Sequence, residues 1–185
     1  MKTRKSKSRV FQMVAGISLD GKITDEYGDF SKYSSPEDKA FLQQKIHESD
    51  VLIMGRVTYE KHSKHGRSQK PVIVFTRSIE GLKIHEEKHS EVHFFHDKKE
   101  DLINLCDLLQ YKVVTILGGA EIYHWFLEQN LVTDVYLTVE PILFEKGKNL
   151  LKGEYLSVQK NWKLVSSQLL NQAGTTLLHY QFPGI

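Results

Sequence analysis

The chain has 185 residues, of which 40% are hydrophobic and 26% charged, a composition typical of a globular protein and not of a disordered or fibrous one. The formal net charge is +2, but five basic and no acidic side chains lie in the first nine residues, at Lys2, Arg4, Lys5, Lys7 and Arg9. The remaining residues carry 20 basic and 23 acidic side chains. We therefore expect residues 1–9 to form a basic flexible tail, and residues 10–185 to form a single domain that does not bind nucleic acid.

The chain offers no sign of a membrane span, a signal peptide or a metal site. Its apolar runs are shorter than the roughly 18 residues that a span requires, and the run after the basic tail leads into Asp20-Gly21 without a cleavage site. The single cysteine, Cys106, excludes an internal disulfide and favours a buried thiol in the reducing cytoplasm. The nine histidines lie mostly in charged stretches without the spacing of a zinc motif, so we expect no metal.

The first half of the chain alternates between predicted strands and a helix. Val10–Ile17 is apolar enough for a buried strand, and Ser35-Pro36-Glu37-Asp38 predicts a helix start with a capping serine, a proline in the first position and acids in the first turn. The short apolar runs 51–54 and 71–75 predict two central strands covered on both faces.

The second half continues this alternation and ends in a predicted hairpin. A strand over 92–95 precedes a helix that begins with a capping box from Asp97 to Glu100, and a strand over 113–117 precedes Gly118-Gly119 and a further helix. Alternation then indicates a half-buried strand, with Val135, Leu137 and Val139 on one face and Tyr136, Thr138 and Glu140 on the other. Runs 162–170 and 175–182 form the hairpin. The succession predicts a three-layer α/β domain whose central sheet is mostly parallel, with a C-terminal antiparallel hairpin.

Three predicted strands are followed by residues suited to anion binding. These residues are Gly55, Arg56 and Thr58 after the second strand, Thr76, Arg77 and Ser78 after the third, and Gly118, Gly119, Ala120 and Glu121 after the fifth. Glycines admit an anion close to the backbone, and guanidinium groups and free N–H groups at helix starts bind phosphate. Each group also suits an ordinary turn, but the carboxyl ends of parallel strands share one edge. Together they predict a long phosphorylated ligand lying across that edge.

Six short motifs make the chain resemble the dihydrofolate reductase superfamily from residue 10 to the C-terminus. They are Ser18-Leu19-Asp20-Gly21-Lys22-Ile23, Leu52-Ile53-Met54-Gly55-Arg56 with Thr58-Tyr59-Glu60, Thr76-Arg77-Ser78, Leu117-Gly118-Gly119-Ala120-Glu121-Ile122-Tyr123, Val135-Tyr136-Leu137-Thr138 and Asn161-Trp162. The first motif is most similar to the C-terminal reductase domain of the bifunctional riboflavin-biosynthesis deaminase-reductases and to its stand-alone bacterial relatives.

The resemblance implies that the domain binds NADPH. Gly55, Arg56 and Thr58 would hold phosphates, and Thr76, Arg77 and Ser78 would bind the 2′-phosphate. Gly118 and Gly119 would form a close-approach turn, commonly a cis peptide in this family. The remaining cofactor residues would be Ala120, Glu121 and Ile122 beside the pyrophosphate, and Ala15 and Ile23 beside the nicotinamide.

On the substrate side, Asp38 matches the acid that binds the pterin ring in dihydrofolate reductases, and Thr138 matches its threonine partner. Asp38 is thus the catalytic candidate, although an acid there also favours a helix N-terminus. Asp20 is either a turn former or a polar group at the substrate mouth. The segment 25–33 lacks the Met-Pro-Trp-like stretch of typical folate reductases, and we expect this loop and the loop 60–70 to determine the substrate. Arg67 would contact either a substrate phosphate or only solvent.

The resemblance therefore implies a cytoplasmic, homodimeric, NADPH-dependent oxidoreductase that reduces a pyrimidine or pterin-type heterocycle. The activity it most closely implies is that of a 5-amino-6-(5-phosphoribosylamino)uracil reductase in riboflavin biosynthesis. Dihydrofolate reduction and a non-catalytic NADPH-binding module are the alternatives. A deaminase is disfavoured, because the zinc-binding cysteines of that class are missing from the sequence.

Overall fold

The structure is a computed structural model that describes residues 9–62, 70–77, 92–95, 98–152 and 161–183. Most of the predicted basic tail, Arg67, Asp97 and the candidate cofactor residue Ser78 lie outside the described residues.

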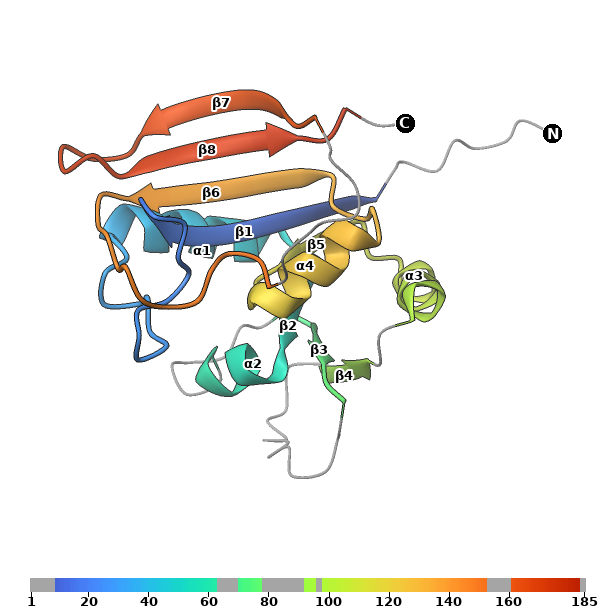
Figure 1. The fold of residues 1–185 in the computed structure, drawn as a ribbon. Helices are drawn as coiled ribbons and strands as arrows, with labels where there is room; N and C mark the ends of the chain where they lie inside the picture. The colour runs from blue at the N-terminus through green and yellow to red at the C-terminus, as the bar shows by residue number, and fades with distance from the viewer. Residues whose placement is uncertain (1–8, 63–69, 78–91, 96–97, 153–160, 184–185) are drawn as a thin grey trace.

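A single eight-stranded sheet runs through the molecule in the order β4-β3-β2-β5-β1-β6-β8-β7 (Figure 1). Its strands are β1 Val10–Ser18, β2 Val51–Gly55, β3 Val72–Phe75, β4 Val92–Phe95, β5 Val113–Ile116, β6 Asp134–Glu140, β7 Lys163–Leu169 and β8 Thr176–Gln181. β1 to β6 pair in parallel, whereas β8 is antiparallel to both β6 and β7. The predicted parallel sheet and C-terminal antiparallel hairpin are confirmed.

Among the described residues, four helices cover the two faces of the sheet, so that helices, sheet and helices form three layers. They are α1 Pro36–Glu48, α2 Arg56–His62, α3 Lys99–Leu108 and α4 Ala120–Glu128. Because successive strand residues point to opposite faces, each strand contributes to two cores. One core joins Leu52 and Met54 to α1 and α2, and the other joins Ile53 to α3 and α4, where Phe126 is fully buried. Figure 1 shows α1 and α4 on opposite sides of β1.

The first residues of α1 and α3 differ in whether a side chain caps the helix. The predicted start of α1 is confirmed, since Ser35 is the N-cap and its side chain accepts the Asp38 N–H at 3.1 Å. α3 begins at Lys99, and its N-cap Lys98 makes no side-chain capping bond. The predicted capping box includes Asp97, which lies outside the described residues, and it stays a prediction. Glu100 and Asp101 in the first turn of α3 favour the positive end of the helix dipole.

β6 is the strand on which the burial pattern departs most from expectation. Its apolar residues Val135, Leu137 and Val139 are half-buried, whereas Thr138 and Glu140 on the other face are only 1% and 3% exposed. The reason is α1, which packs on that face, with the rings of Phe41 and Tyr136 5.7 Å apart. β6 therefore carries polar side chains into the protein interior, beside the start of α1.

Within the described residues, no helix is long and apolar enough to cross a membrane, and no cluster of three or more His, Cys, Asp or Glu side chains could hold a metal ion. Cys106 is fully buried in α3, and burial raises the pKa of its thiol to about 11.

Candidate active site

The exits of β2 and β5 meet at the carboxyl edge of the sheet. The backbone N–H of Gly55 donates to the carbonyl of Gly118 at 2.7 Å. A Cβ placed on Gly119 would lie 3.9 Å from Thr58 Oγ1, so the hydroxyl at the start of α2 faces the glycine turn. Ile122 packs on the same junction, 3.2 Å from the position of a Cβ at Gly55. This junction brings together two of the three groups that the sequence predicted to share an edge, and Arg77 of the third group reaches Glu121 at 3.6 Å.

The Gly118-Gly119 turn is tightly enclosed on one side. Its peptide bond is cis, as the family resemblance implied, and Gly118 has a φ of +88°. A Cβ on Gly118 would lie 2.7 Å from the ring of Tyr123, which leaves no room for a side chain. Gly119 is the N-cap of α4 and provides no side-chain cap, and Ala120 begins the helix. The start of α4 therefore presents backbone groups and no capping side chain.

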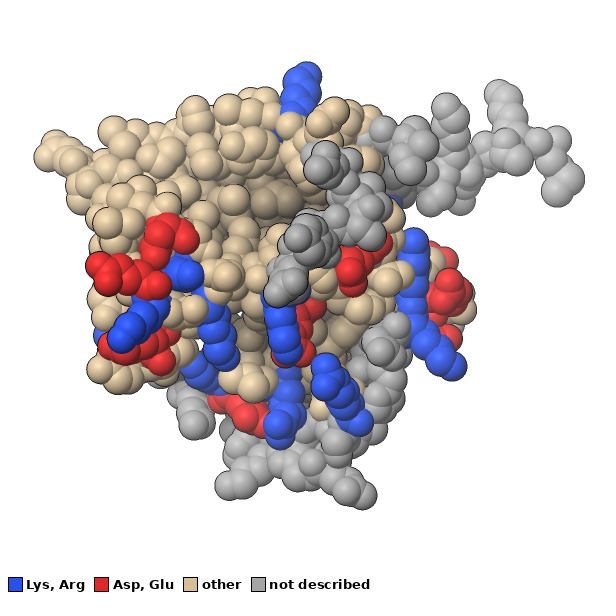
Figure 2. Space-filling view, in the orientation of Figure 1, with Lys and Arg blue, Asp and Glu red and all other residues tan. Residues whose placement is uncertain are grey.

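Positive side chains surround Glu121 in that first turn. Lys152 Nζ lies 2.5 Å from one carboxylate oxygen, and Arg77 Nη2 lies 3.6 Å from the other. The hydrogen bond from Lys152 is the main cause that lowers the pKa of Glu121, and the charges of Lys152 and Arg77 add to it. Figure 2 shows Lys and Arg gathered over the lower part of this face, whereas the area over β7 and β8 is almost free of charge. Sequence reasoning missed Lys152, because the residues before it were not predicted to form a strand.

The other predicted cofactor residues take varied positions. Arg56 is half-exposed at the start of α2, with Nη1 3.7 Å from Glu60, and Thr76 follows β3 directly. Ala15 is buried in β1, and Ile23 is packed at the border of the same apolar core. Their predicted contacts with the nicotinamide, like the roles of the other site residues, stay predictions.

Asp38 is a buried acid at the start of α1, only 7% exposed. Its Oδ2 accepts a short hydrogen bond from the Ser34 hydroxyl, and Thr138 on β6 also hydrogen bonds to its side chain. Burial is the main cause that raises the pKa of Asp38, the two hydroxyls oppose it, and the charge of nearby Glu140 raises it further. The Asp38–Thr138 pair expected from the sequence is therefore present. A carboxyl group with a raised pKa is a typical proton donor in active sites.

An aromatic side chain, Phe30, closes over Gly16 beside this acid. A Cβ on Gly16 would lie 2.5 Å from Phe30 Cε1 and 3.2 Å from Asp38 Oδ2, so only a glycine lets the ring come this close. Phe30 meets Phe144 edge to face with ring centroids 6.0 Å apart. An open hollow of about 370 Å³ lies between the loop 25–33, which carries Phe30, and the segment 142–144. It is lined by Asp25, Glu26, Tyr27, Tyr33, Ile142, Leu143 and Phe144. Sequence reasoning placed specificity in the loop 25–33 but did not single out Phe30.

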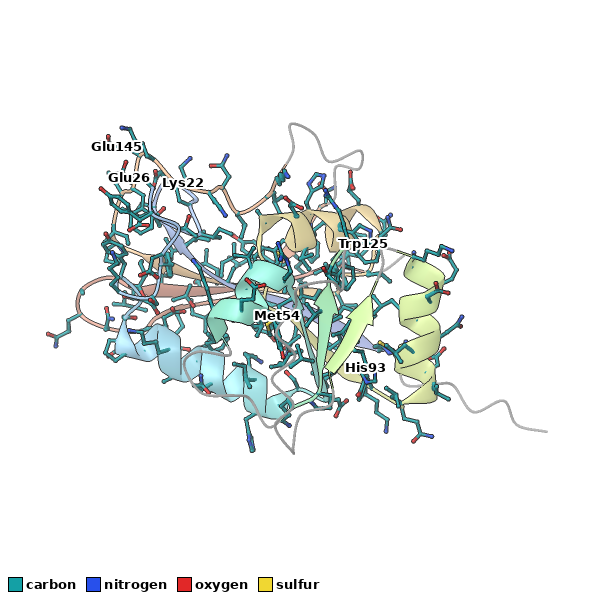
Figure 3. All side chains as sticks on the ribbon, turned by 90° about the horizontal axis from the view of Figure 1, so that it is seen from below. Lys22, Glu26, Met54, His93, Trp125 and Glu145 are labelled. Carbon is teal, nitrogen blue, oxygen red and sulfur yellow. The ribbon has the colours of Figure 1, made fainter. Side chains whose placement is uncertain are left out.

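Asp20 lies at the corner where the loops after β1 and β6 meet. One of its oxygens accepts from the Ser18 hydroxyl at 2.6 Å and the other from the Glu145 N–H at 2.9 Å. The Ser18 bond is the main cause that lowers the pKa of Asp20. In Figure 3, Lys22, Glu26 and Glu145 lie together at this corner, away from Met54 in the sheet. The turn-forming alternative for Asp20 thus has direct contacts, and its substrate role stays a prediction.

Comparison with known proteins found one matching family and several solved structures with a similar fold. The family model of the RibD C-terminal domain matches residues 9–174. A crystal structure from Shewanella sp. PV-4, provisionally assigned to riboflavin biosynthesis, is 23% identical with a TM-score of 0.80, over 95% of this chain and 99% of that one. The diaminohydroxyphosphoribosylaminopyrimidine deaminase/5-amino-6-(5-phosphoribosylamino)uracil reductase of Thermotoga maritima is 18% identical with a TM-score of 0.76, over 95% of this chain and 57% of that one.

The dihydrofolate reductase of Enterococcus faecalis, in complex with NADP(H) and RAB-propyl, is similar as well. It is 20% identical with a TM-score of 0.67, over 95% of this chain and 97% of that one. At these identities the structural likeness shows a shared fold, and the family model covers most of the chain. The chain shares the fold of this dihydrofolate reductase. The protein belongs to the RibD C-terminal domain family.

Proposed function

We propose that the protein is an NADPH-dependent reductase of a pyrimidine or pterin-type heterocycle, most closely a 5-amino-6-(5-phosphoribosylamino)uracil reductase. The observation that carries the proposal is the position of Asp38, a buried acid beside the glycine turn. Tyr123 lies between the two: its ring encloses Gly118, and its hydroxyl donates to the carbonyl of Val14 at 2.7 Å, two residues before Gly16, which lies against Asp38. In this proposal, Asp38 donates the proton and the glycine turn binds the cofactor.

The residues at this edge fit a pyridine dinucleotide. Gly118 and Gly119 keep backbone accessible where a side chain would block it, and Gly55, bonded to Gly118, joins the neighbouring strand exit. The hydroxyl of Thr58 and the guanidinium groups of Arg56 and Arg77 would hold phosphate oxygens. NADPH, when bound there, would supply the hydride.

Asp38 would supply the proton that completes the reduction. Hydride addition to a carbon of a C=N or C=O group leaves an electron pair on the nitrogen or oxygen, which takes the Asp38 proton. The hydroxyls of Ser34 and Thr138 orient the carboxyl group, and Phe30 lies against Gly16 on the same side. Hydrogen bonds that fix a donor in one geometry favour the reacting arrangement over the many that free rotation would allow.

The direct test is the oxidation of NADPH, followed by its absorbance, with 5-amino-6-(5-phosphoribosylamino)uracil and with dihydrofolate as acceptors. We expect turnover with the phosphoribosylaminouracil. Turnover with dihydrofolate alone would replace the proposed substrate, and tight NADPH binding without turnover on any acceptor would show a non-catalytic module. The expected homodimer and cytoplasmic location stay predictions.

Replacing Arg77 with alanine tests the proposed 2′-phosphate contact. Because the 2′-phosphate distinguishes NADPH from NADH, the variant should lose about 10- to 100-fold in NADPH affinity, the range of one charge-assisted hydrogen bond, and little in NADH affinity. Tryptophan fluorescence would report both titrations. Lys112→Ala, which removes a positive charge just before β5 at the opposite edge, is the control and should change neither. Equal losses for NADPH and NADH in Arg77→Ala would contradict the assignment.

A further inference from the structure

Glu140 is a buried carboxylate that the proposed reaction does not use. It ends β6 and is 3% exposed. It follows Thr138 by two residues, so both side chains point to the face of the sheet that α1 covers. A buried carboxylate is costly unless hydrogen bonds compensate its lost hydration.

Both oxygens of Glu140 accept a hydrogen bond from a distant part of the chain. Oε1 accepts the backbone N–H of Ser35 at 2.7 Å, and Oε2 accepts the hydroxyl of Thr175 at 2.7 Å. Ser35 is the N-cap of α1, and its hydroxyl accepts the N–H of Asp38 at 3.1 Å. Glu140 therefore holds the residue that begins the helix and, through it, the backbone of Asp38.

The turn between β7 and β8 completes this arrangement. The amide of Asn171 donates to Thr175 Oγ1 at 3.0 Å and to Glu37 Oε2 at 2.9 Å. The Asn171 oxygen accepts the N–H of Thr175 at 3.1 Å. Glu140 thus lies where β6, the first turn of α1 and the C-terminal hairpin are bonded together.

The charge of Glu140 also acts directly on Asp38. The two donors hydrogen bond to both oxygens of Glu140 and compensate the hydration that its carboxylate loses on burial. The groups that act on Asp38 are the anionic Glu140 from β6, Lys39 from α1, the hydroxyls of Ser34 and Thr138, and the neutral Tyr123 from α4. Among these, Glu140 is the only negative charge, and a like charge nearby favours the protonated form of an acid.

We propose that Glu140 is a positioning residue of the reductase site, which fixes the first turn of α1 through Ser35 and holds a negative charge against the proton-donating carboxyl of Asp38. This inference rests on the proposed function. A purely structural role would predict no effect of the charge itself. In our proposal, removing the charge of Glu140 without changing the shape of its side chain should change the pH at which Asp38 loses its proton.

Glu140→Gln is the test, since glutamine keeps the size of the side chain and removes its charge. In the ligand-free protein, ¹³C NMR of the aspartate carboxyl groups, with Asp38 assigned by its loss in Asp38→Asn, should show Asp38 titrating at lower pH than in the wild type. In turnover, the rate falls as pH rises through the pKa of the donor, so this fall should move to lower pH. We expect a roughly tenfold lower kcat at neutral pH and a low-pH plateau within about twofold of the wild type.

Two further variants separate charge from position. Glu48→Gln removes an exposed charge at the other end of α1 and should leave the Asp38 titration and the pH–rate profile unchanged. Glu140→Asp retains the charge on a shorter side chain, so the Asp38 titration should stay near that of the wild type while kcat falls equally at all pH values.

An Asp38 titration that is the same in Glu140→Gln and wild type would overturn the proposal, whatever the activity. If Glu140→Gln does not fold, a lower titration midpoint in Glu140→Asp, where the charge persists, would overturn it as well. If no acceptor is turned over, the proposed function fails, and the titrations still decide whether Glu140 controls the Asp38 proton.

Discussion

Asp38→Asn should lower kcat by about 10²- to 10⁴-fold, the usual contribution of a positioned general acid, and leave NADPH affinity within about twofold. Asparagine has nearly the same shape, can accept the Ser34 hydrogen bond and can donate to Thr138, but it has no proton to give. The fold around it should therefore persist while the chemistry is lost. Single-turnover oxidation of NADPH measures the loss, and fluorescence titration measures the cofactor affinity.

The pH dependence of the reaction rate provides a second test of Asp38→Asn. Burial raises the pKa of Asp38 above the ordinary value of 3.8, so the wild type should lose activity as pH rises through that raised pKa. In Asp38→Asn the residual rate should lack this fall. Glu48→Gln, which removes an exposed carboxylate at the other end of α1, is the matched control and should keep the wild-type profile.

The same raised pKa predicts a change in the free energy of unfolding. An acid that binds its proton more tightly in the folded state contributes stability at low pH, and this contribution is lost as pH rises through the folded pKa. Asp38→Asn removes the buried charge, so its stability relative to the wild type should increase from acidic to neutral pH in urea unfolding. An unchanged kcat in Asp38→Asn would leave Asp38 with only its role at the helix N-terminus.

Gly118→Ala should destabilise the fold by roughly 2–6 kcal/mol and abolish measurable NADPH binding. Two costs add: alanine at a φ of +88° is strained by about 1–3 kcal/mol, and the new methyl group would lie 2.7 Å from the Tyr123 ring. That ring cannot move away freely, because its hydroxyl donates to the carbonyl of Val14 at 2.7 Å and the side chain is buried. Overpacking a core typically costs about 1–3 kcal/mol.

Gly119→Ala is the control for Gly118→Ala, because the two positions are adjacent but differ in space. Gly119 has a φ of −71°, and its nearest atom beyond the chain neighbours is Thr58 Oγ1 at 3.9 Å. Alanine there should leave the unfolding free energy within about 1 kcal/mol of the wild type. The substitution should nevertheless lower the affinity for NADPH, since the methyl group would lie beside Thr58 at the carboxyl edge of the sheet, where we propose that the cofactor binds. Equal stability in the two variants would show that Tyr123 yields to the added methyl group.

The features that could be predicted from the sequence depend on residues that lie close together along the chain or on a regular pattern. The start of α1 was predictable because Ser35, Pro36 and Asp38 act within one turn, and the central strands because their apolar runs require cover on both faces. The exits of β2 and β5 were predictable as partners, since parallel strands bring their carboxyl ends to one edge.

The sequence by itself thus determined the layers of the fold, the family resemblance and the glycine-rich edge, because each depends on neighbouring residues or on a periodic pattern. Only the tertiary structure decided the surroundings of Asp38. Glu140 meets Ser35 across 105 residues, and Lys152 meets Glu121 across 31. The polar face of β6 is buried because α1 covers it. Such contacts depend on how distant elements pack, and a local pattern carries no information about which side chain will face a buried acid.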